Sequence, residues 1–315
     1  MKRNDLAFLF PGQGSQSVTM LTALAERHAV VQKTFIEAST AFGEDLWALS
    51  CDGPEALINR TDHTQPLMLT AGVAVWRAWI QAGGPKPAAL AGHSLGEYTA
   101  LVCGGALSFP DAVALVHDRG RFMQDAVPEG EGAIAAVLGL EDGVIQSVCE
   151  QAAEGEVVEP VNYNAPGQVV IAGHAGAVER ALTVAREAGA KRAIPLPMSV
   201  PAHCSLMAPA AEKLAERLSA VTLATPDIPI IHNVDVSESG SPEAIRERLV
   251  DQVRSPVRWT ECVQALAERG VNQVVECGPG RVLAGLNRRI KRDLVSQAIY
   301  DPDSLAGALD TLEAE

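Results

Sequence analysis

The sequence has no excess of basic residues. Its 315 residues contain 25 Lys and Arg against 39 Asp and Glu, which gives a formal net charge of −14 and an isoelectric point near 5.0. Proteins that bind a phosphate backbone need a basic surface. The composition therefore argues against nucleic acid as the main partner. It does not exclude a local basic patch on the surface.

The sequence also lacks paired cysteines and long apolar runs. None of its six cysteines forms a Cys-x-x-Cys pair or a zinc-ligand spacing, so they are expected to be reduced, mostly buried thiols. Only a few apolar residues separate Asp5 from Pro11, too few for the core of a signal peptide, and no run is long enough to span a membrane. We expect a cytoplasmic protein without a membrane segment.

Against this background, residues 92–96 read Gly-His-Ser-Leu-Gly. A short apolar run, residues 88–91, precedes them, and a helix-like run, residues 97–102, follows. This context predicts a nucleophile elbow, a tight strand-to-helix turn that lifts the Ser94 hydroxyl clear of a sheet. The first amides of the helix lack intrahelical partners and could stabilise an oxyanion. A plain turn serine is the alternative.

A serine nucleophile needs a base to take its proton. Of the seven histidines, His203 and His232 occupy loop or strand-end positions, where catalytic groups tend to lie. His203 is preferred because it follows a proline-stiffened turn, although either residue could be a structural histidine. No carboxylate stands out as the third member of a triad, and a His-Gly-Gly-Gly motif is absent, which argues against a standard hydrolase.

Two further features have two interpretations each. The loop Pro11-Gly12-Gln13-Gly14 follows a predicted buried strand, residues 6–10, and is either a ligand loop or a plain turn; its spacing does not fit a phosphate loop. Arg119 lies on a predicted helix from Ser108 to about Gln124, on the flank of the apolar stripe. An arginine there is usually a surface residue that covers apolar side chains with its stem.

Strands that alternate with helices at both ends of the chain predict an α/β fold with a doubly wound, mostly parallel sheet, similar to the core of α/β-hydrolases. Residues 127–199 read instead as strand, helix, two strands, helix and strand, the ferredoxin-like βαββαβ order. We therefore predict a large core, residues 1–126 and 200–315, with residues 127–199 as an inserted ferredoxin-like subdomain.

Taken together, the motifs resemble those of the malonyl-CoA:acyl carrier protein transacylases of type II fatty acid synthesis, over essentially the whole chain. The matching segments are Phe10–Gln16, Thr64–Pro66, Gly92–Glu97, Arg119–Gly120, Asn162–Gln168, Ser199–His203, Pro256–Trp259 and Glu276–Gly280.

The resemblance implies a role for several residues. Ser94 would be acylated, His203 would act as base and then acid, and a backbone carbonyl near Gln252 would orient the histidine. The amides of Gln13 and Leu95 would form the oxyanion hole. Arg119 would hold the malonyl carboxylate, because a guanidinium fork matches a carboxylate. Gln65 and Asn162 would help to bind the substrate.

The resemblance also implies a ping-pong reaction without metal or prosthetic group. Malonyl-CoA would acylate Ser94, and the phosphopantetheine thiol of holo-acyl carrier protein would then attack the ester; CoA is a substrate only. The predicted helix from residue 281 to residue 292 has five basic and no acidic residues, and we expect it to dock the acidic carrier protein, with a solvated helix as the alternative: Arg281, Arg288, Arg289, Lys291 and Arg292.

Three alternative functions and the oligomeric state complete the sequence-based expectations. A serine thioesterase or esterase, a docking module without turnover, and an acyltransferase of polyketide synthesis are the alternative functions. A monomer is expected, because no association motif stands out.

Overall fold

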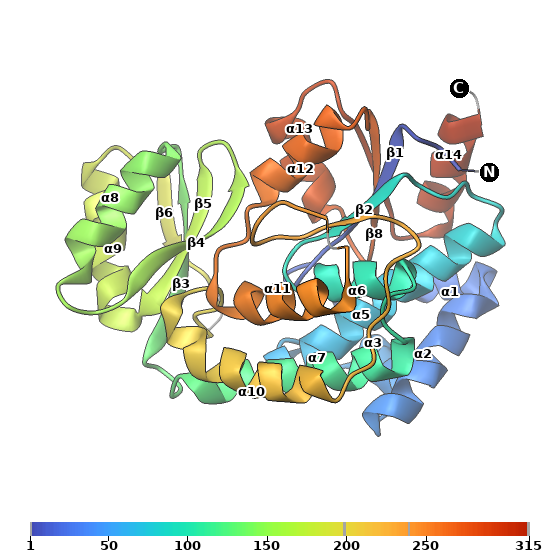
Figure 1. Cartoon of the computed structure of the whole chain (residues 1–315), viewed down its shortest axis with the longest axis horizontal. Helices are drawn as coiled ribbons and strands as arrows, with labels where there is room; N and C mark the ends of the chain where they lie inside the picture. Colours follow the sequence, from blue (N-terminus) through green and yellow to red (C-terminus); the bar gives the residue numbers. More distant parts are fainter. Residues whose placement is uncertain (1, 198–199, 239, 314–315) are drawn as a thin grey trace.

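The computed structural model describes residues 2–197, 200–238 and 240–313. Figure 1 shows two bodies side by side, a larger one that contains both termini and a smaller one formed by the middle of the chain. No helix among the described residues is long and apolar enough to cross a membrane.

A five-stranded parallel sheet lies at the centre of the larger body, with the strand order β7-β2-β1-β8-β9. The strands are β1 (Leu6–Phe10), β2 (Ala89–Gly92), β7 (Ile230–Ile231), β8 (Gln273–Cys277) and β9 (Val295–Ile299). All residues of β1, β2 and β8 are buried, as expected for parallel strands covered on both faces. The carboxyl ends of β1, β2 and β8 meet at one edge, where open α/β sheets bind ligands.

Helices cover both faces of this sheet (Figure 1). Those before the insert are α1 (Thr22–Arg27), α2 (Ala29–Phe42), α3 (Leu46–Asp52), α4 (Glu55–Ile58), α5 (Thr61–Gln81), α6 (Gly96–Cys103) and α7 (Phe109–Ala126). Those after it are the 3-10 turn η1 (Ser205–Met207), α10 (Ala208–Ser219), α11 (Pro242–Arg254), α12 (Trp259–Glu268), α13 (Val282–Ile290) and α14 (Pro302–Glu313).

The smaller body has an antiparallel sheet with the strand order β4-β5-β3-β6. Its elements are β3 (Gly132–Leu138), α8 (Asp142–Ala153), β4 (Val158–Ala165), β5 (Gln168–His174), α9 (Ala175–Glu187) and β6 (Arg192–Pro195). Their βαββαβ sequence confirms the predicted ferredoxin-like order. The division of the chain at residues 127 and 199 stays a prediction, and residue 199 lies outside the described residues.

Several sequence-based details differ from the structure. The sequence predicts helices over residues 64–81 and 256–269, but the corresponding helices α5 and α12 begin at Thr61 and Trp259. The β-branched run from residue 228 to residue 234, which includes His232 and Asn233, contributes only the two-residue strand β7. In the predicted helix from residue 281 to residue 292, helical spacing predicts that Val282, Leu283, Leu286 and Ile290 face the core. Val282 is instead 48% exposed, because helical side chains lean toward the helix N-terminus and Val282 is the first residue of α13.

Candidate active site

The turn between β2 and α6 has the geometry of the predicted nucleophile elbow. Ser94 adopts a φ of 52°, a left-handed conformation that costs energy for a residue with a Cβ. A Cβ on Gly92 would lie 1.9 Å from the carbonyl carbon of Gly96, and one on Gly96 would lie 2.0 Å from the Phe10 carbonyl oxygen. Both positions therefore require glycine, which explains the spacing of the motif.

His203 is the histidine that reaches the Ser94 hydroxyl. Its Nε2 lies 2.7 Å from Ser94 Oγ, and its Nδ1 donates to the Gln252 main-chain carbonyl at 2.7 Å. This second bond fixes the tautomer in which Nε2 accepts a proton. Burial, with a contribution from the Arg119 charge, lowers the pKa of His203 to about 3, so the ring is neutral at physiological pH.

The Gln252 carbonyl takes the position that a triad carboxylate would otherwise occupy. Gln252 lies in the last turn of α11, where carbonyl groups have no intrahelical partner. The His203 main-chain amide donates to the neighbouring Val253 carbonyl at 3.0 Å. The end of α11 therefore holds both the backbone and the ring of His203.

Arg119 is buried beside Ser94, so its interpretation as a surface residue is wrong. Its side chain is 1% exposed and donates to Gln65 Oε1 at 2.7 Å, to Gln252 Oε1 at 3.0 Å and to Ser94 Oγ at 3.3 Å. The guanidinium also lies over the Tyr98 ring, 5.3 Å from its centroid. Burial lowers the pKa of Arg119, but a guanidinium stays charged in proteins.

A cavity of about 70 Å³ opens beside Ser94 and His203. Gln13 of the loop after β1 and Asn162 of β4 line it, so both bodies contribute to its wall. Within the described part of the chain, the main-chain amides of Gln13 and Leu95 make no hydrogen bond, and Leu95 directly precedes α6. The remaining wall comes from His93, Met123, Ile134 and Ala202.

Sequence reasoning missed a group of buried polar residues under the elbow. Asn233 accepts a hydrogen bond from the Ser94 amide at 2.8 Å and donates to the Gly92 carbonyl at 2.7 Å. His232, the second candidate base, instead contacts Glu97 through a 2.6 Å hydrogen bond, with both side chains fully buried. A His-Asn pair at the end of an apolar run was the only signal in the sequence.

Comparisons with known proteins agree with this geometry. A family model described as the acyl transferase domain matches residues 7–304. The malonyl CoA-acyl carrier protein transacylase of Salmonella typhimurium is 55% identical over 97% of this chain and 99% of its own.

Solved structures agree equally well. An acyl carrier protein S-malonyltransferase from Vibrio cholerae superposes with a TM-score of 0.95 at 55% identity, covering 96% of this chain and 99% of the other. A malonyl-transacylase solved in complex with its type II PKS acyl-carrier protein superposes with a TM-score of 0.96 at 52% identity, covering 98% and 99%.

Proposed function

Because this chain belongs to the acyl transferase family, and within it to the malonyl-CoA:acyl carrier protein transacylases, we propose that it transfers malonyl groups from malonyl-CoA to the phosphopantetheine thiol of acyl carrier protein in fatty acid biosynthesis. The observation that carries the proposal is the 2.7 Å contact between Ser94 Oγ and a neutral, fixed His203. It supplies both the nucleophile and the base of an acyl transfer.

In the first half-reaction, Ser94 Oγ attacks the thioester carbonyl while His203 Nε2 takes the hydroxyl proton. The tetrahedral oxyanion lies against the free amides of Gln13 and Leu95. The carbon–sulfur bond then breaks, the proton on His203 passes to the CoA sulfur, and a malonyl ester remains on Ser94. Removal of one oxyanion donor costs about 10²–10³ in rate in related chemistry.

In the second half-reaction, His203 takes the proton of the phosphopantetheine thiol, and the sulfur attacks the ester carbonyl. The carbon–oxygen bond breaks and the proton returns to Ser94 Oγ. The backbone carbonyl of Gln252 keeps His203 in the required tautomer through both steps. A carboxylate is not needed for this orientation, because the carbonyl oxygen also accepts a hydrogen bond from Nδ1–H.

Arg119 selects the malonyl group by binding its free carboxylate, and Gln65 orients the guanidinium. The Arg119 Nε forms no hydrogen bond with a described residue, so a donor remains for a ligand. The positive charge of this buried guanidinium favours an anionic acyl chain. Asn162, on the opposite wall, contributes a polar contact to the acyl group or the pantetheine arm.

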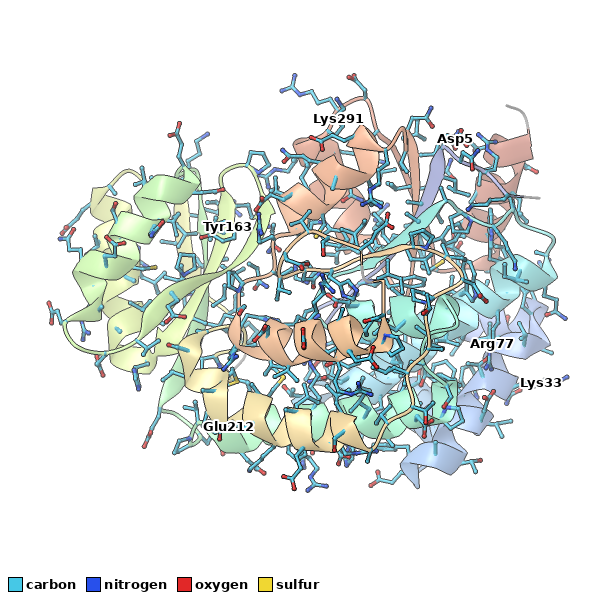
Figure 2. All side chains as sticks on the ribbon, in the orientation of Figure 1. Asp5, Lys33, Arg77, Tyr163, Glu212 and Lys291 are labelled. Atoms are coloured by element: carbon cyan, nitrogen blue, oxygen red, sulfur yellow. The ribbon has the colours of Figure 1, made fainter. Side chains whose placement is uncertain are left out.

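The carrier protein docks on α13 in this proposal. The turn before α13 contacts the Gln13 loop, since a Cβ on Gly278 would lie 2.5 Å from the Pro11 ring. At the other end of the helix, Arg289 donates to Gln168 of the smaller body. The cations of this face are exposed, and Figure 2 shows Lys291 pointing away from the protein: Arg281, Arg288, Arg289, Lys291 and Arg292.

Three further expectations, on oligomeric state, location and domain division, complete the proposal. The protein acts as a monomer in the cytoplasm. Residues 1–126 and 200–315 form the acyltransferase core, and residues 127–199 form a subdomain that closes one wall of the cavity.

One assay tests the function directly. The protein is mixed with malonyl-CoA, with and without holo-acyl carrier protein, and free CoA and malonyl-carrier are followed over time. We expect CoA release equal to one equivalent of enzyme without carrier, and sustained formation of malonyl-carrier with it. Sustained CoA release without carrier would instead identify a thioesterase.

A further inference from the structure

Glu97 is a buried carboxylate that the proposed reaction does not yet use. It lies in the first turn of α6, three residues after Ser94, and its side chain is fully buried. A buried carboxylate destabilises a protein unless hydrogen bonds and charges compensate for its lost hydration. The contacts of Glu97 therefore indicate which groups it holds.

Three donors meet the Glu97 carboxylate. His232 Nδ1 donates to Oε1 at 2.6 Å, while the Asn233 main-chain amide and Gln252 Nε2 both donate to Oε2 at 3.0 Å. All three partner residues are fully buried. The carboxylate therefore connects the loop after β7, helix α11 and the elbow, three segments that are far apart in the sequence.

Two of these partners hold the peptide groups of Ser94. Asn233 Oδ1 accepts from the Ser94 amide at 2.8 Å, and Gln252 Nε2 donates to the Ser94 carbonyl at 2.9 Å. Ser94 has a left-handed backbone, which persists only where its surroundings determine it. Asn233 and Gln252 provide that constraint from both sides.

Gln252 also contacts the base and the selectivity residue. Its side-chain Oε1 accepts from Arg119 Nη2 at 3.0 Å, and its main-chain carbonyl accepts from His203 Nδ1 at 2.7 Å. A primary amide can rotate by 180° and exchange its donor and acceptor ends. Because a carboxylate only accepts, Glu97 requires Nε2 on its own side and leaves Oε1 for Arg119.

We propose that Glu97 is a positioning residue that sets the orientation of the Gln252 amide, and thereby aligns Arg119 for the malonyl carboxylate and the Ser94 backbone for attack. It touches no reacting atom and acts through Gln252 and Asn233. The proposal deepens the proposed function and depends on malonylation of Ser94. Its signature is a loss of malonyl selectivity together with a loss of rate.

The test compares Ser94 acylation by malonyl-CoA and by acetyl-CoA, followed by intact mass after rapid quenching. The variants are Glu97→Met, which removes the acceptor, Glu97→Asp, which withdraws it, and Glu97→Gln, which retains one acceptor oxygen. For Glu97→Met we expect a malonylation rate reduced on the order of 10²-fold, similar to the loss of another site-organising hydrogen bond. The malonyl-to-acetyl rate ratio should fall about tenfold, corresponding to about 1.4 kcal/mol of transition-state selectivity.

Glu97→Asp should show intermediate values, and Glu97→Gln should recover most of the selectivity. Glu276 offers a matched control, because it is a second fully buried carboxylate, whose Oε2 accepts from the Ala284 amide at the start of α13. Glu276→Met should lower the melting temperature but leave the malonyl-to-acetyl ratio unchanged.

An unchanged ratio in Glu97→Met and Glu97→Asp, or an equal change in Glu276→Met, would assign Glu97 a structural role only. The same conclusion follows if neither Glu97→Asp nor Glu97→Gln folds. The wild-type protein separates this question from the proposed function, because absence of a malonyl adduct on wild-type Ser94 would refute the transfer reaction itself.

Discussion

The region under Ser94 and the outer face of α13 hold their polar groups in opposite ways. Under Ser94, Glu97, Asn233 and Gln252 are fully buried, and each makes several directed hydrogen bonds. Directly after α13, the side chains of Lys291 and Arg292 are exposed, and among the described residues they make no hydrogen bond or ion pair. The first region is built for fixed geometry, and the second for attraction at a distance.

The physical consequences of substitution differ accordingly. A buried polar group that loses its partner costs about 1–3 kcal/mol, and salt hardly screens it. An exposed charge contributes about 0–1 kcal/mol and acts mainly on encounter rates, which fall as salt rises. Substitutions near Ser94 should therefore change the chemistry at any ionic strength, and those on α13 should change binding at low salt only.

Ser94→Ala should have the largest effect, because it removes the acyl acceptor. Brief mixing of the wild-type protein with malonyl-CoA should give one malonyl adduct by intact mass, and the variant should give none. The thiols of Cys103 and Cys204 are poor substitutes, since desolvation raises the pKa of Cys204 to about 12 and that of Cys103 well above its ordinary value. If Ser94→Ala still transferred malonyl groups and carried a malonyl adduct on Cys103 or Cys204, the assignment of Ser94 would be wrong.

Arg119→Ala should come next in size. A hydrogen bond to a charged group contributes about 1.5–3 kcal/mol, so malonylation should fall on the order of 10²-fold, while acetylation from acetyl-CoA is kept or rises. Arg119→Lys should recover only part of the loss, because an ammonium cannot form the planar fork. Rates measured with both acyl-CoAs provide the check. A proportional fall of both rates would make Arg119 a structural residue.

The sequence predicted the parts of this site that depend on local geometry. The elbow at Ser94 was predictable because glycine at positions 92 and 96 and a strand-to-helix switch are local properties. The ferredoxin-like insert was predictable because the order of its strands and helices follows from local periodicity. The choice of His203 over His232 rested on its proline-stiffened turn, and the structure brings His203 to the serine.

What sequence reasoning missed depends on long-range contacts. The bonds from Asn233 and Gln252 to Ser94 join residues 139 and 158 positions apart, which no local pattern encodes. Helix periodicity alone favours a surface position for Arg119. The resemblance to the transacylases assigned it to the site instead, and the packing of α5, α7 and α11 buries it there. Helix periodicity also failed for Val282, because the side chain of the first residue of α13 leans beyond the helix N-terminus.

The pH dependence of acylation should be small on the acid side. The pKa of His203 is lowered to about 3 from 6.5, so the ring stays a neutral base. We expect the rate of Ser94 malonylation to change little between pH 7 and pH 5. A base with an ordinary pKa of about 6.5 would lose about tenfold by pH 5.5. Quenched-flow acylation at several pH values measures this, and an inflection near pH 6.5 would contradict it.

The same shift has a consequence for stability. Below about pH 6.5 the unfolded chain protonates His203 and the native protein does not, so this histidine makes unfolding easier as the pH falls toward 3. The free energy of unfolding of wild type should decrease more between pH 7 and pH 4 than that of His203→Gln. Equal decreases in denaturant titrations would show that His203 gains its proton in the native state.

The smallest effect, and the one that salt should remove, belongs to α13. Reversal of Arg288 and Arg292 to Glu should raise the apparent KM for acyl carrier protein severalfold at low salt, because like charges slow the encounter with an acidic partner. Charge screening over about 10 Å at 0.1 M salt should reduce the difference.

The control reverses Arg27 and Lys33, exposed cations of α1 and α2; Figure 2 shows Lys33 on a different part of the surface from Lys291. This pair changes the net charge equally, so its KM for carrier should stay near that of wild type, and malonylation of Ser94 should be unaffected in both proteins. Equal KM changes in the two double variants would show that net charge alone causes the effect, and not the position of the cations. Unchanged carrier kinetics across the salt series would exclude Arg288 and Arg292 from the docking surface. The next residues to test would then be Lys191 and Arg192, which line a groove of about 460 Å³ together with Arg289.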